Sequence, residues 1–369
     1  MEIQDITVYT YDANYSFGTY TMSGGRSATG QPSIVVRIRT KDGIEGWAET
    51  APLDSNYLPS SFTGELAALK ELGPHVLGLD PRSPAAINVV MDRIMMGGTA
   101  AKAVIDIACW DILGKAVGLP TSTLLGGCLT ESPPAFAVIP VEDPEAAVKQ
   151  ALEEVTKGLT ALQLKVGDNP LSDARRVRAI REAVPETVQV WADANAGWNL
   201  EQALTFARAL GQDVAVQLEQ PCRALSDCAE FGRRTGIPVV LDESAVTMAD
   251  LVAGHAAGVT GVNIKSSRVG GFTKARAMRD AAVALDVVVV VDDPWGGALT
   301  TAQNLQIAAS TRPDRLRAVD LFAEWTKPLV APEVPRMQSN GRVSRTTAPG
   351  NGVGEVDMGV LGEPLFQIA

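Results

Sequence analysis

The chain has 369 residues, of which 46% are hydrophobic and 20% are charged, and its formal net charge is −11. A chain of this length is longer than one small core requires, and it fits a full barrel with an additional domain. The acidic balance and the lack of a basic stretch argue against a nucleic-acid partner. No uninterrupted apolar run reaches membrane-spanning length, so we expect no membrane partner.

Two further features concern the cellular compartment. The N-terminal residues Met-Glu-Ile-Gln-Asp have neither the basic nor the apolar region of a secretion signal. The four cysteines contain no CxxC pattern, which is typical of reduced thiols rather than of disulfides or a metal site. We therefore expect a soluble, cytoplasmic protein.

The N-terminal part of the chain predicts an antiparallel sheet followed by helices. Apolar and polar residues alternate over residues 3–11 and again over residues 33–40, as in half-buried strands. Between them, residues 16–31 are rich in Gly, Ser and Thr, and a loop of this length in a compact domain favours a functional role over a passive one. Over residues 64–118 the pattern becomes helical.

The middle of the chain contains six short apolar runs that each end in a charged residue. These terminal residues recur every 23 to 28 positions, and the segments between the runs, such as residues 170–183, 200–210 and 273–285, are helix-like. Alternating strands and helices predict βαβ units and a parallel sheet. The nearly constant repeat is typical of a (β/α)8 barrel, in which the C-terminal ends of the strands meet at one mouth. The charged residues are Lys165, Asp193, Glu219, Asp242, Lys265 and Asp292.

Three carboxylates of this set, Asp193, Glu219 and Asp242, follow three successive apolar runs. Ionisable groups at the ends of buried strands require a counter-charge, and a divalent cation suits three carboxylates. Three oxygen ligands leave half of an octahedral Mg²⁺ shell free for water or for a substrate carboxylate. The alternative is three surface ion pairs, which fits poorly with positions directly after apolar runs. The sequence therefore predicts a magnesium site.

Two lysines flank this trio in the chain, Lys165 before it and Lys265 after it. In a closed barrel they would lie on opposite sides of the metal. A lysine removes a proton at neutral pH only when its pKa is lowered, which burial and a nearby cation both favour. Two such bases facing one carbon predict racemisation, epimerisation or elimination through an enolate whose charge the metal stabilises. The alternative is that both lysines only neutralise carboxylates.

The combination of these lysines with Asp193-Ala194-Asn195, Glu219-Gln220-Pro221 and Asp242-Glu243-Ser244 resembles the enolase superfamily. The apolar helix over residues 103–115, followed by Leu-Leu-Gly-Gly, looks like that superfamily's capping-domain junction. The resemblance implies a modified (β/α)8 TIM barrel with an α+β capping domain, a Mg²⁺ cofactor and a lysine or histidine base. It also implies two N-terminal loops that close over a small carboxylate substrate, and a homo-oligomer.

On this basis we expect three segments. Residues 1–125 form the α+β capping domain. Residues 126–327 form the catalytic barrel, with its first strand within residues 134–139 and its last within residues 318–322. The tail, residues 328–369, is Gly- and Pro-rich with short strands and packs back on the capping domain.

The basic residues indicate the branch of the superfamily. The two histidines, His75 and His255, do not end barrel strands, so the His–Asp dyad of mandelate-racemase-like members is missing. The paired lysines resemble the muconate-lactonising branch, which includes cycloisomerases and amino-acid racemases. That branch has Lys-x-Lys on the second strand, whereas this chain has Gln163-Leu164-Lys165. Lowering the pKa of Lys165 would therefore depend more heavily on Mg²⁺.

Substrate clues lie near the last strands and in the N-terminal part. The run from Asp292 to Gly297, Asp-Asp-Pro-Trp-Gly-Gly, resembles members that act on proline derivatives, and its carboxylates would suit a substrate ammonium. Tyr57 and Phe322 are expected either to form a cation–π wall for the ring nitrogen or to pack at the domain interface. The predicted substrate-binding residues are Tyr57, Gln163, Asn195, Asp292, Asp293, Trp295 and Phe322.

The leading hypothesis is Mg²⁺-dependent removal of the proton α to a carboxylate, with dehydration of cis-3-hydroxy-L-proline as the outcome. Phe322 aligns with a Trp of hydroxyproline-betaine epimerases, and its weaker cation–π face favours a secondary amine. The alternatives are a 2-epimerase or racemase of proline betaine-type or N-substituted amino acids, and a non-catalytic barrel that only binds a carboxylate. A nucleotide-dependent oxidoreductase is set aside because no GxGxxG follows a strand.

Overall fold

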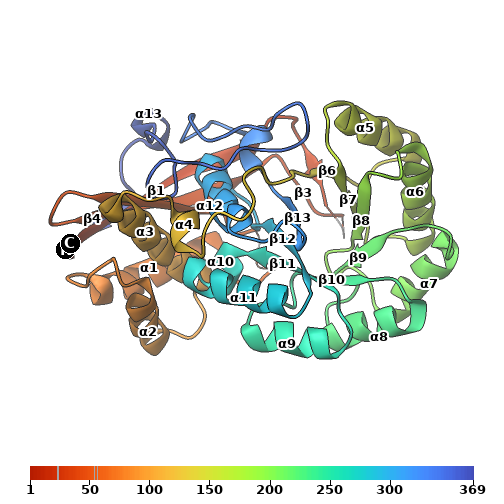
Figure 1. The fold of residues 1–369 in the computed structure, drawn as a ribbon, viewed down its shortest axis with the longest axis horizontal. Helices are drawn as coiled ribbons and strands as arrows, with labels where there is room; N and C mark the ends of the chain where they lie inside the picture. The colour runs from red at the N-terminus through yellow and green to blue at the C-terminus, as the bar shows by residue number, and fades with distance from the viewer. Residues whose placement is uncertain (23–24, 54, 56) are drawn as a thin grey trace.

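The computed structural model describes residues 1–22, 25–53, 55 and 57–369. Two main sheets organise these residues, a five-stranded antiparallel sheet and an eight-stranded parallel sheet. In Figure 1 most of the antiparallel sheet lies to the left, and the parallel strands with most of their outer helices lie in the centre and to the right. The predicted fold class, a modified (β/α)8 barrel with an α+β capping domain, is confirmed.

The antiparallel sheet forms where apolar and polar residues alternate in the sequence. Its longest strands are β1 (Ile3–Tyr15), β4 (Gly30–Thr40) and β5 (Glu45–Thr50), and β5 lies at one edge. Two helices pack on it, α1 (Phe62–Val76) and α3 (Thr99–Val117), and α2 (Pro84–Ile94) packs on both helices. The loop expected at residues 16–31 contains a short hairpin of β2 (Tyr20–Thr21) and β3 (Ser27–Ala28) and the start of β4, while its residues 23–24 lie outside the described part.

Helix α3 lies between the antiparallel sheet and the barrel. It contacts β5, and it also contacts α10 (Ser266–Val269) and α11 (Phe272–Ala284). This double contact explains why the helix is apolar on nearly every face. Gly46 in β5 lies so close to the backbone of Ala108 that any Cβ would clash, so this contact requires glycine.

The parallel sheet follows the order of the sequence from β6 to β13. A parallel bridge between Ala135 and Val319 connects its two ends, which makes the sheet a barrel. The strands are β6 (Ala137–Ile139), β7 (Ala161–Lys165), β8 (Gln189–Asp193), β9 (Gln217–Glu219), β10 (Val239–Leu241), β11 (Gly261–Lys265), β12 (Val288–Asp292) and β13 (Leu316–Val319).

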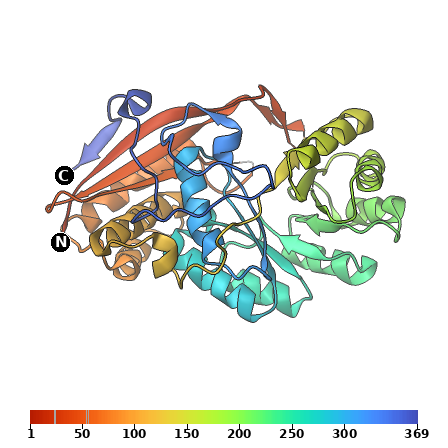
Figure 2. The same cartoon turned by 45° about the horizontal axis from the view of Figure 1, so that its top comes forward.

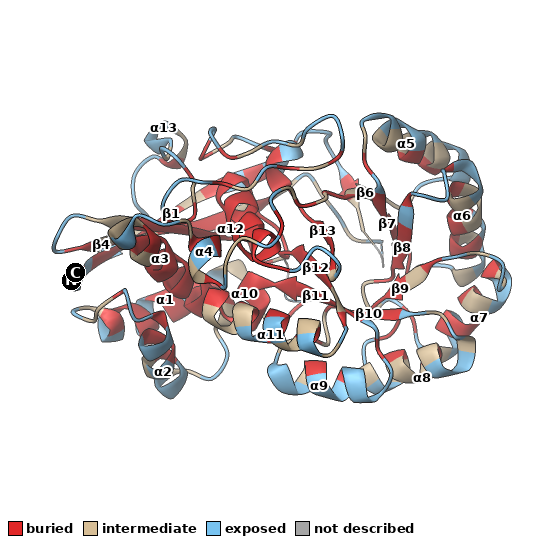
Figure 3. Ribbon diagram, in the orientation of Figure 1, coloured by how far each residue is buried: buried red, intermediate tan, exposed pale blue. Residues whose placement is uncertain are grey.

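Helices alternate with these strands and cover the outside of the barrel. Four of the eight begin at a side-chain N-cap, which is Asp143, Asn169, Asn199 or Thr247. Asn199 and Gln202 form a capping box, and so do Thr247 and Asp250. Figure 3 shows that the outer faces of α8 and α9 are exposed, whereas α12 is buried. The helices are α5 (Pro144–Thr156), α6 (Pro170–Ala183), α7 (Leu200–Leu210), α8 (Leu225–Thr235), α9 (Met248–Ala256), α10, α11 and α12 (Ala298–Ala309).

The end of the chain returns to the N-terminal sheet. Strands β14 (Thr326–Lys327) and β15 (Phe366–Ile368) both pair antiparallel with β1. Figure 2 shows the two termini close together beside this sheet. Two short helices complete the described elements, α4 (Thr121–Leu124) after α3 and α13 (Met358–Leu361) in the tail.

One strand expectation is wrong in part. The last barrel strand was expected within residues 318–322, but β13 ends at Val319 and Phe322–Glu324 forms the 3-10 helix η2. The chain turns away from the barrel there, and Phe322 packs against Trp295 and Trp325. Across the described ranges, no helix has both the length and the apolar content needed to cross a membrane.

Candidate active site

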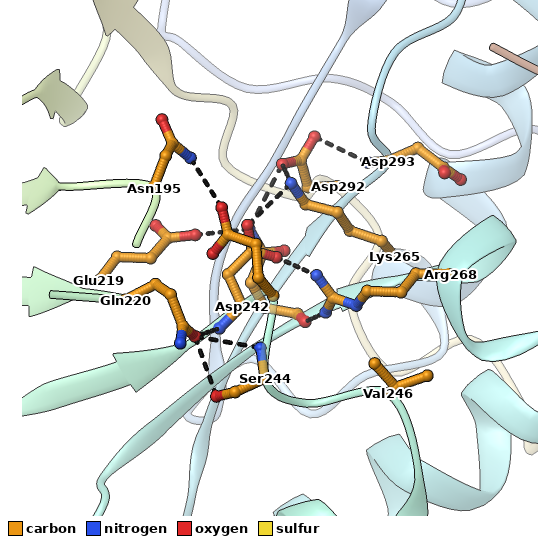
Figure 4. A network of polar contacts seen from close by, with 12 residues as sticks. Asn195, Glu219, Gln220, Asp242, Ser244, Val246, Lys265, Arg268, Asp292 and Asp293 are labelled. Carbon is orange, nitrogen blue, oxygen red and sulfur yellow. Dashed lines mark hydrogen bonds and ion pairs between the residues drawn. The ribbon is translucent and has the colours of Figure 1, made fainter. Parts of the chain in front are cut away.

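The barrel places the predicted charged residues around one mouth. Lys165, Asp193 and Glu219 are the last residues of β7, β8 and β9, and they stand in register with one another. Lys265 and Asp292 end β11 and β12 in the same way, also in register. Asp242 follows the last residue of β10. The structure therefore brings these six residues together at the C-terminal ends of the strands. Figure 4 shows four of them, Glu219, Asp242, Lys265 and Asp292.

Glu219 is held by neutral donors. Its carboxylate accepts hydrogen bonds from Gln163 Nε2 at 3.0 Å, Trp191 Nε1 at 2.7 Å and Asn263 Nδ2 at 2.8 Å. Within the described residues, no lysine or arginine forms an ion pair with it. Burial, with the nearby Asp193 and Asp242 charges, raises the pKa of Glu219 to about 8. This carboxylate therefore lacks a counter-charge.

Asp193 lies against the first lysine. Lys165 Nζ is 2.5 Å from Asp193 Oδ2, and the backbone and side-chain nitrogens of Asn195 each donate to the same carboxylate at 2.9 Å. Asn195 has a positive φ of 43°, a conformation that Asn tolerates better than most residues. Burial lowers the pKa of Lys165, but the charge and hydrogen bond of Asp193, together with Tyr20 and Glu219, outweigh it, so the pKa lies above its usual range.

Asp242 contacts the second lysine and two further side chains. It pairs with Lys265 Nζ at 3.0 Å and with the Arg268 guanidinium, and it accepts a hydrogen bond from Tyr57 Oη at 2.9 Å. Burial opposes ionisation of Asp242, but the charges of Lys265 and Arg268 hold its pKa below the usual range. Gln220 fixes the backbone here, because its Oε1 accepts hydrogen bonds from the backbone nitrogens of Asp242 and Ser244.

Lys265 has three partners at its ammonium. Its Nζ donates to Tyr57 Oη at 2.7 Å and lies 3.0 Å from Asp242 and 3.2 Å from Asp292. Burial lowers the pKa of Lys265, whereas the charges of Asp242 and Asp292 raise it. The raising effects are larger together, so the pKa lies above its usual range. The expectation of lowered lysine pKa values depended on burial as well as on a bound cation, and burial alone does not lower them here. The protein's own carboxylates act in the opposite direction.

The carboxylate trio suits a divalent cation in its chemistry. Three oxygen donors from neighbouring strand ends are fully buried, and one of them, Glu219, has only neutral partners. Yet in the described part of the chain no three His, Cys, Asp or Glu side chains are arranged to coordinate a metal ion. Carboxylate oxygens of Asp193 and Asp242 form ion pairs with Lys165 and Arg268 instead. Oxygen-rich, acidic sites of this kind are those that Mg²⁺ prefers. The residues fit the ion once Asp193 and Asp242 exchange these ion pairs for it.

A cavity opens beside the two lysines. Asp293 at its edge bonds to the Ser267 hydroxyl, and burial followed by the Asp292 charge raises the pKa of Asp293. Both lysines and all of the predicted substrate-binding residues line this cavity. Its described lining residues are Tyr20, Met22, Arg26, Leu53, Tyr57, Val138, Gln163, Lys165, Asn195, Lys265, Asp292, Asp293, Pro294, Trp295, Asp320, Phe322 and Trp325.

Aromatic rings form one wall of the cavity. The ring centroid of Trp295 lies 5.4 Å from that of Phe322 and 5.3 Å from that of Trp325. Tyr20, from the N-terminal hairpin, lies 6.1 Å from Trp295. Phe322 therefore packs against Trp295 and also lines the cavity, and its role as a cation–π wall stays a prediction.

Several residues at the site were not predicted. Arg268 binds Asp242, and Asn263 donates to both Glu219 and Asp292. Asn263 could have been found, because it lies two residues before Lys265 in β11, and strand residues two apart share a face. Tyr20 lies in the two-residue strand β2 and Trp325 directly follows η2, and segments this short have no periodic pattern that would indicate their packing.

Two family models match the chain. A model described as "Mandelate racemase / muconate lactonizing enzyme, N-terminal domain" matches residues 5–126, and one described as "Enolase C-terminal domain-like" matches residues 146–358. Together they span both the capping part and the barrel.

Named relatives match all or most of the chain. A cis-3-hydroxy-L-proline dehydratase from Roseibium aggregatum is 38% identical over 99% of both chains. An N-succinyl-L-Arg/Lys racemase from Bacillus cereus is 33% identical over 70% of this chain and 69% of its own. A crystal structure of a mandelate racemase/muconate lactonizing enzyme from Roseovarius nubinhibens, complexed with magnesium, has a TM-score of 0.95, 31% identity and full coverage of both chains.

Proposed function

The chain belongs to the enolase superfamily and is an enzyme of the lyase or isomerase class, and from this premise we propose that it dehydrates cis-3-hydroxy-L-proline with Mg²⁺. Because the relatives are named as a dehydratase and a racemase, we discard the hypothesis of a barrel that only binds a carboxylate. The relative that shares nearly the full length of this chain is named for this dehydration. The observation that carries the proposal is a pair of lysines on opposite sides of one cavity.

The two lysines are placed for chemistry at one carbon. Lys165 ends β7 and Lys265 ends β11, and three strands separate them in an eight-stranded barrel, so they face each other across its mouth. Both line the same cavity. A substrate α-carbon between them would have an amine on each face, within reach of its proton. Mg²⁺ bound by Asp193, Glu219 and Asp242 would supply positive charge where the substrate carboxylate becomes more negative.

The cavity also offers recognition of a cyclic amine. Asp292 lies at its edge and already bonds a cation, Lys265, so its carboxylate can accept a hydrogen bond from a substrate ammonium. The Trp295, Phe322 and Trp325 rings provide an apolar surface for ring carbons. An amino acid with its nitrogen in a five-membered ring combines both features.

The proposed elimination balances as follows. A lysine amine takes the proton from C2, and the electron pair of that C–H bond forms the C2=C3 double bond. The C3–O bond breaks, and the oxygen leaves as water after it accepts a proton from the ammonium of the opposite lysine. The product is a cyclic enamine acid, which tautomerises to an imine. In the cis isomer the hydroxyl lies on the same face as the carboxylate, so the C2 proton and the hydroxyl lie on opposite faces and one lysine would serve each; proton exchange with solvent then restores both lysines.

Racemisation or epimerisation of an N-substituted amino acid is the second candidate. It needs one lysine to remove the proton and the opposite lysine to return one, which the facing pair permits. The similarity to a racemase over two thirds of the chain favours keeping this alternative.

Incubation of the Mg²⁺-loaded enzyme in D₂O separates these outcomes. We expect cis-3-hydroxy-L-proline to lose water, seen by mass spectrometry, and the trans isomer to react far more slowly. EDTA should abolish the reaction. Exchange of the α-proton of N-succinyl amino acids without water loss from the hydroxyproline would instead favour the racemase. Water loss that persists unchanged in Lys165→Ala and Lys265→Ala would contradict the assignment of the lysines.

A further inference from the structure

Tyr57 connects a lysine to one of the acidic residues through a single hydroxyl. It lies between β5 and α1, outside the barrel sequence, and its side chain reaches the barrel mouth. Its Oη accepts a hydrogen bond from Lys265 Nζ at 2.7 Å and donates one to Asp242 Oδ2 at 2.9 Å. Its ring centroid is 5.3 Å from the same Nζ. The phenol therefore contacts Lys265 through both its oxygen and its ring.

These contacts fix the position of the Lys265 nitrogen. An ammonium has three donors, and here they have three partners: Tyr57, Asp242 and Asp292. The two carboxylates have other tasks in the proposed reaction, since Asp242 would bind Mg²⁺ and Asp292 would receive the substrate amine. Tyr57 is then the partner that stays available to Lys265 throughout. A neutral acceptor can hold the nitrogen whether or not it carries its third proton.

The other lysine has a different environment. Lys165 Nζ is held by Asp193 at 2.5 Å, and its described hydrogen bonds include none to Tyr57. Because the two lysines lie on opposite sides of the barrel, a group that contacts Lys265 acts on one side of the cavity. Tyr57 therefore contacts the lysine on one side of the cavity and not the lysine on the other side.

We propose that Tyr57 is a positioning residue for Lys265, which its hydroxyl holds in place for proton transfer at one face of the substrate α-carbon. This rests on the proposed function, in which both lysines act on that carbon. It differs from the roles that a wall residue or a support for the metal site would have. A wall residue would act through its ring, and a support for Asp242 would change Mg²⁺ binding, and neither would distinguish the two faces.

The test compares the two faces in the Mg²⁺-loaded enzyme. Lys165→Ala and Lys265→Ala first show which lysine exchanges the α-proton of L-proline and which that of D-proline in D₂O. Tyr57→Phe keeps the ring and removes the hydroxyl. We expect it to slow exchange of the enantiomer that depends on Lys265 by about 10- to 100-fold, the usual cost of a misplaced catalytic group, and to change the other by less than about twofold.

Tyr9→Phe is the matched control, because Tyr9 is a buried phenol of the capping sheet packed on Trp47, away from the cavity. We expect it to leave both exchange rates unchanged. Mg²⁺ affinity, measured by titration calorimetry, should differ by less than about twofold between wild type and Tyr57→Phe. An equal loss for both enantiomers, no loss for either, or a loss that follows weakened Mg²⁺ binding would overturn the proposal.

A second measurement does not depend on the reaction. With ¹³C at the lysine ε-carbons, the NMR signal of Lys265, assigned by its loss in Lys265→Arg, should shift in Tyr57→Phe while that of Lys165 stays in place. An unmoved Lys265 signal would refute the contact whatever the enzyme catalyses. If neither lysine variant changes exchange but the Lys265 signal shifts, the proposed function fails and the positioning contact stands.

Discussion

Glu219 differs from the other two carboxylates of the trio in its surroundings. Asp193 and Asp242 each have a basic partner, whereas Glu219 is surrounded by the amides of Gln163 and Asn263 and the indole of Trp191. Neutral donors orient a carboxylate without cancelling its charge. Glu219 is therefore the member of the trio that has no basic partner to give up when a cation binds.

Replacing Glu219 with Gln should weaken Mg²⁺ binding by at least about 100-fold, because the site loses one of its negative oxygen ligands. The shape of the side chain is kept, but its amide nitrogen cannot accept a hydrogen bond, so the donors on one side of it, Gln163 and Trp191 or else Asn263, lose their acceptor. Titration calorimetry with MgCl₂ on the purified protein measures the change directly.

Glu131→Gln is the matched control, since Glu131 is exposed and pairs with Arg345 on the surface. It should bind Mg²⁺ as the wild type does. Equal affinity in Glu219→Gln and wild type would show that Glu219 is not a metal ligand.

At the residue scale, the sequence identifies the charged residue at the end of each strand but not the side chains that contact it. Lys165, Asp193 and Glu219 are predictable because a charge directly after a buried run must face the mouth of a barrel. Arg268 was missed because its partner depends on how a short helix turns after β11. The Tyr57 hydroxyl bridge depends on a loop path that no local pattern encodes.

At the scale of elements, the prediction succeeds where local signals and tertiary packing agree. Helices α6 and α7 occupy the predicted residues 170–183 and 200–210, because Asn169 and Asn199 cap their starts and one face is apolar. The predicted last strand runs too far because Leu321 and Phe322 favour a strand locally, while the structure packs Phe322 in an aromatic cluster. The short hairpin within residues 16–31 has no alternating pattern long enough to predict it.

Asp106 joins two elements of different parts of the molecule. It lies in α3 of the capping region, and its carboxylate accepts hydrogen bonds from Thr273 at the start of α11 and from Asn88 in α2. Burial raises the pKa of Asp106 from 3.8 to about 6 despite these donors. Between these two pH values the folded state retains a proton that the unfolded state has lost. The contribution of Asp106 to stability therefore falls as the pH rises from about 4 to 6.

Asp106→Asn removes this ionisation and should change the pH dependence. Relative to wild type, the free energy of unfolding of the variant should rise by about 3 kcal/mol between pH 4 and pH 7, the value of a shift of about two pKa units. Its stability at pH 4 should be lower than that of the wild type, because an amide nitrogen replaces one acceptor. Urea unfolding followed by circular dichroism across this range measures both. A difference between the two proteins that does not vary with pH would contradict the shifted pKa.

At the scale of the whole molecule, the cavity depends on both parts of the chain. Tyr20 and Tyr57 come from the N-terminal part, whereas Lys165 and Lys265 come from the barrel. The relative placement of the two parts therefore sets the geometry of the site. The boundary at residues 125 and 126, the homo-oligomer and the cytoplasmic location stay predictions.

Glu49 is a central contact between these parts. It is fully buried in β5, and its carboxylate accepts hydrogen bonds from Tyr11 at 2.5 Å and Ser33 at 2.6 Å within the capping sheet. It also accepts one from the backbone nitrogen of Thr300 in α12 at 2.9 Å. Gln303 of the same helix bonds the backbone of Glu49 in both directions. A charge with this number of donors is well solvated by the protein itself.

Glu49→Ala should lower the free energy of unfolding by about 3 kcal/mol, because it leaves buried hydroxyl and amide donors without an acceptor. Urea denaturation followed by circular dichroism, without Mg²⁺ or substrate, measures the loss. Glu131→Ala is the control: its ion pair is exposed, and the cost should be below about 1 kcal/mol. Since the capping sheet and α12 are joined at Glu49, we also expect a lower dehydration rate at saturating substrate in the folded variant. A stability loss as small as that of the control would show that the other contacts of β5 with α12 are enough to hold the two parts together.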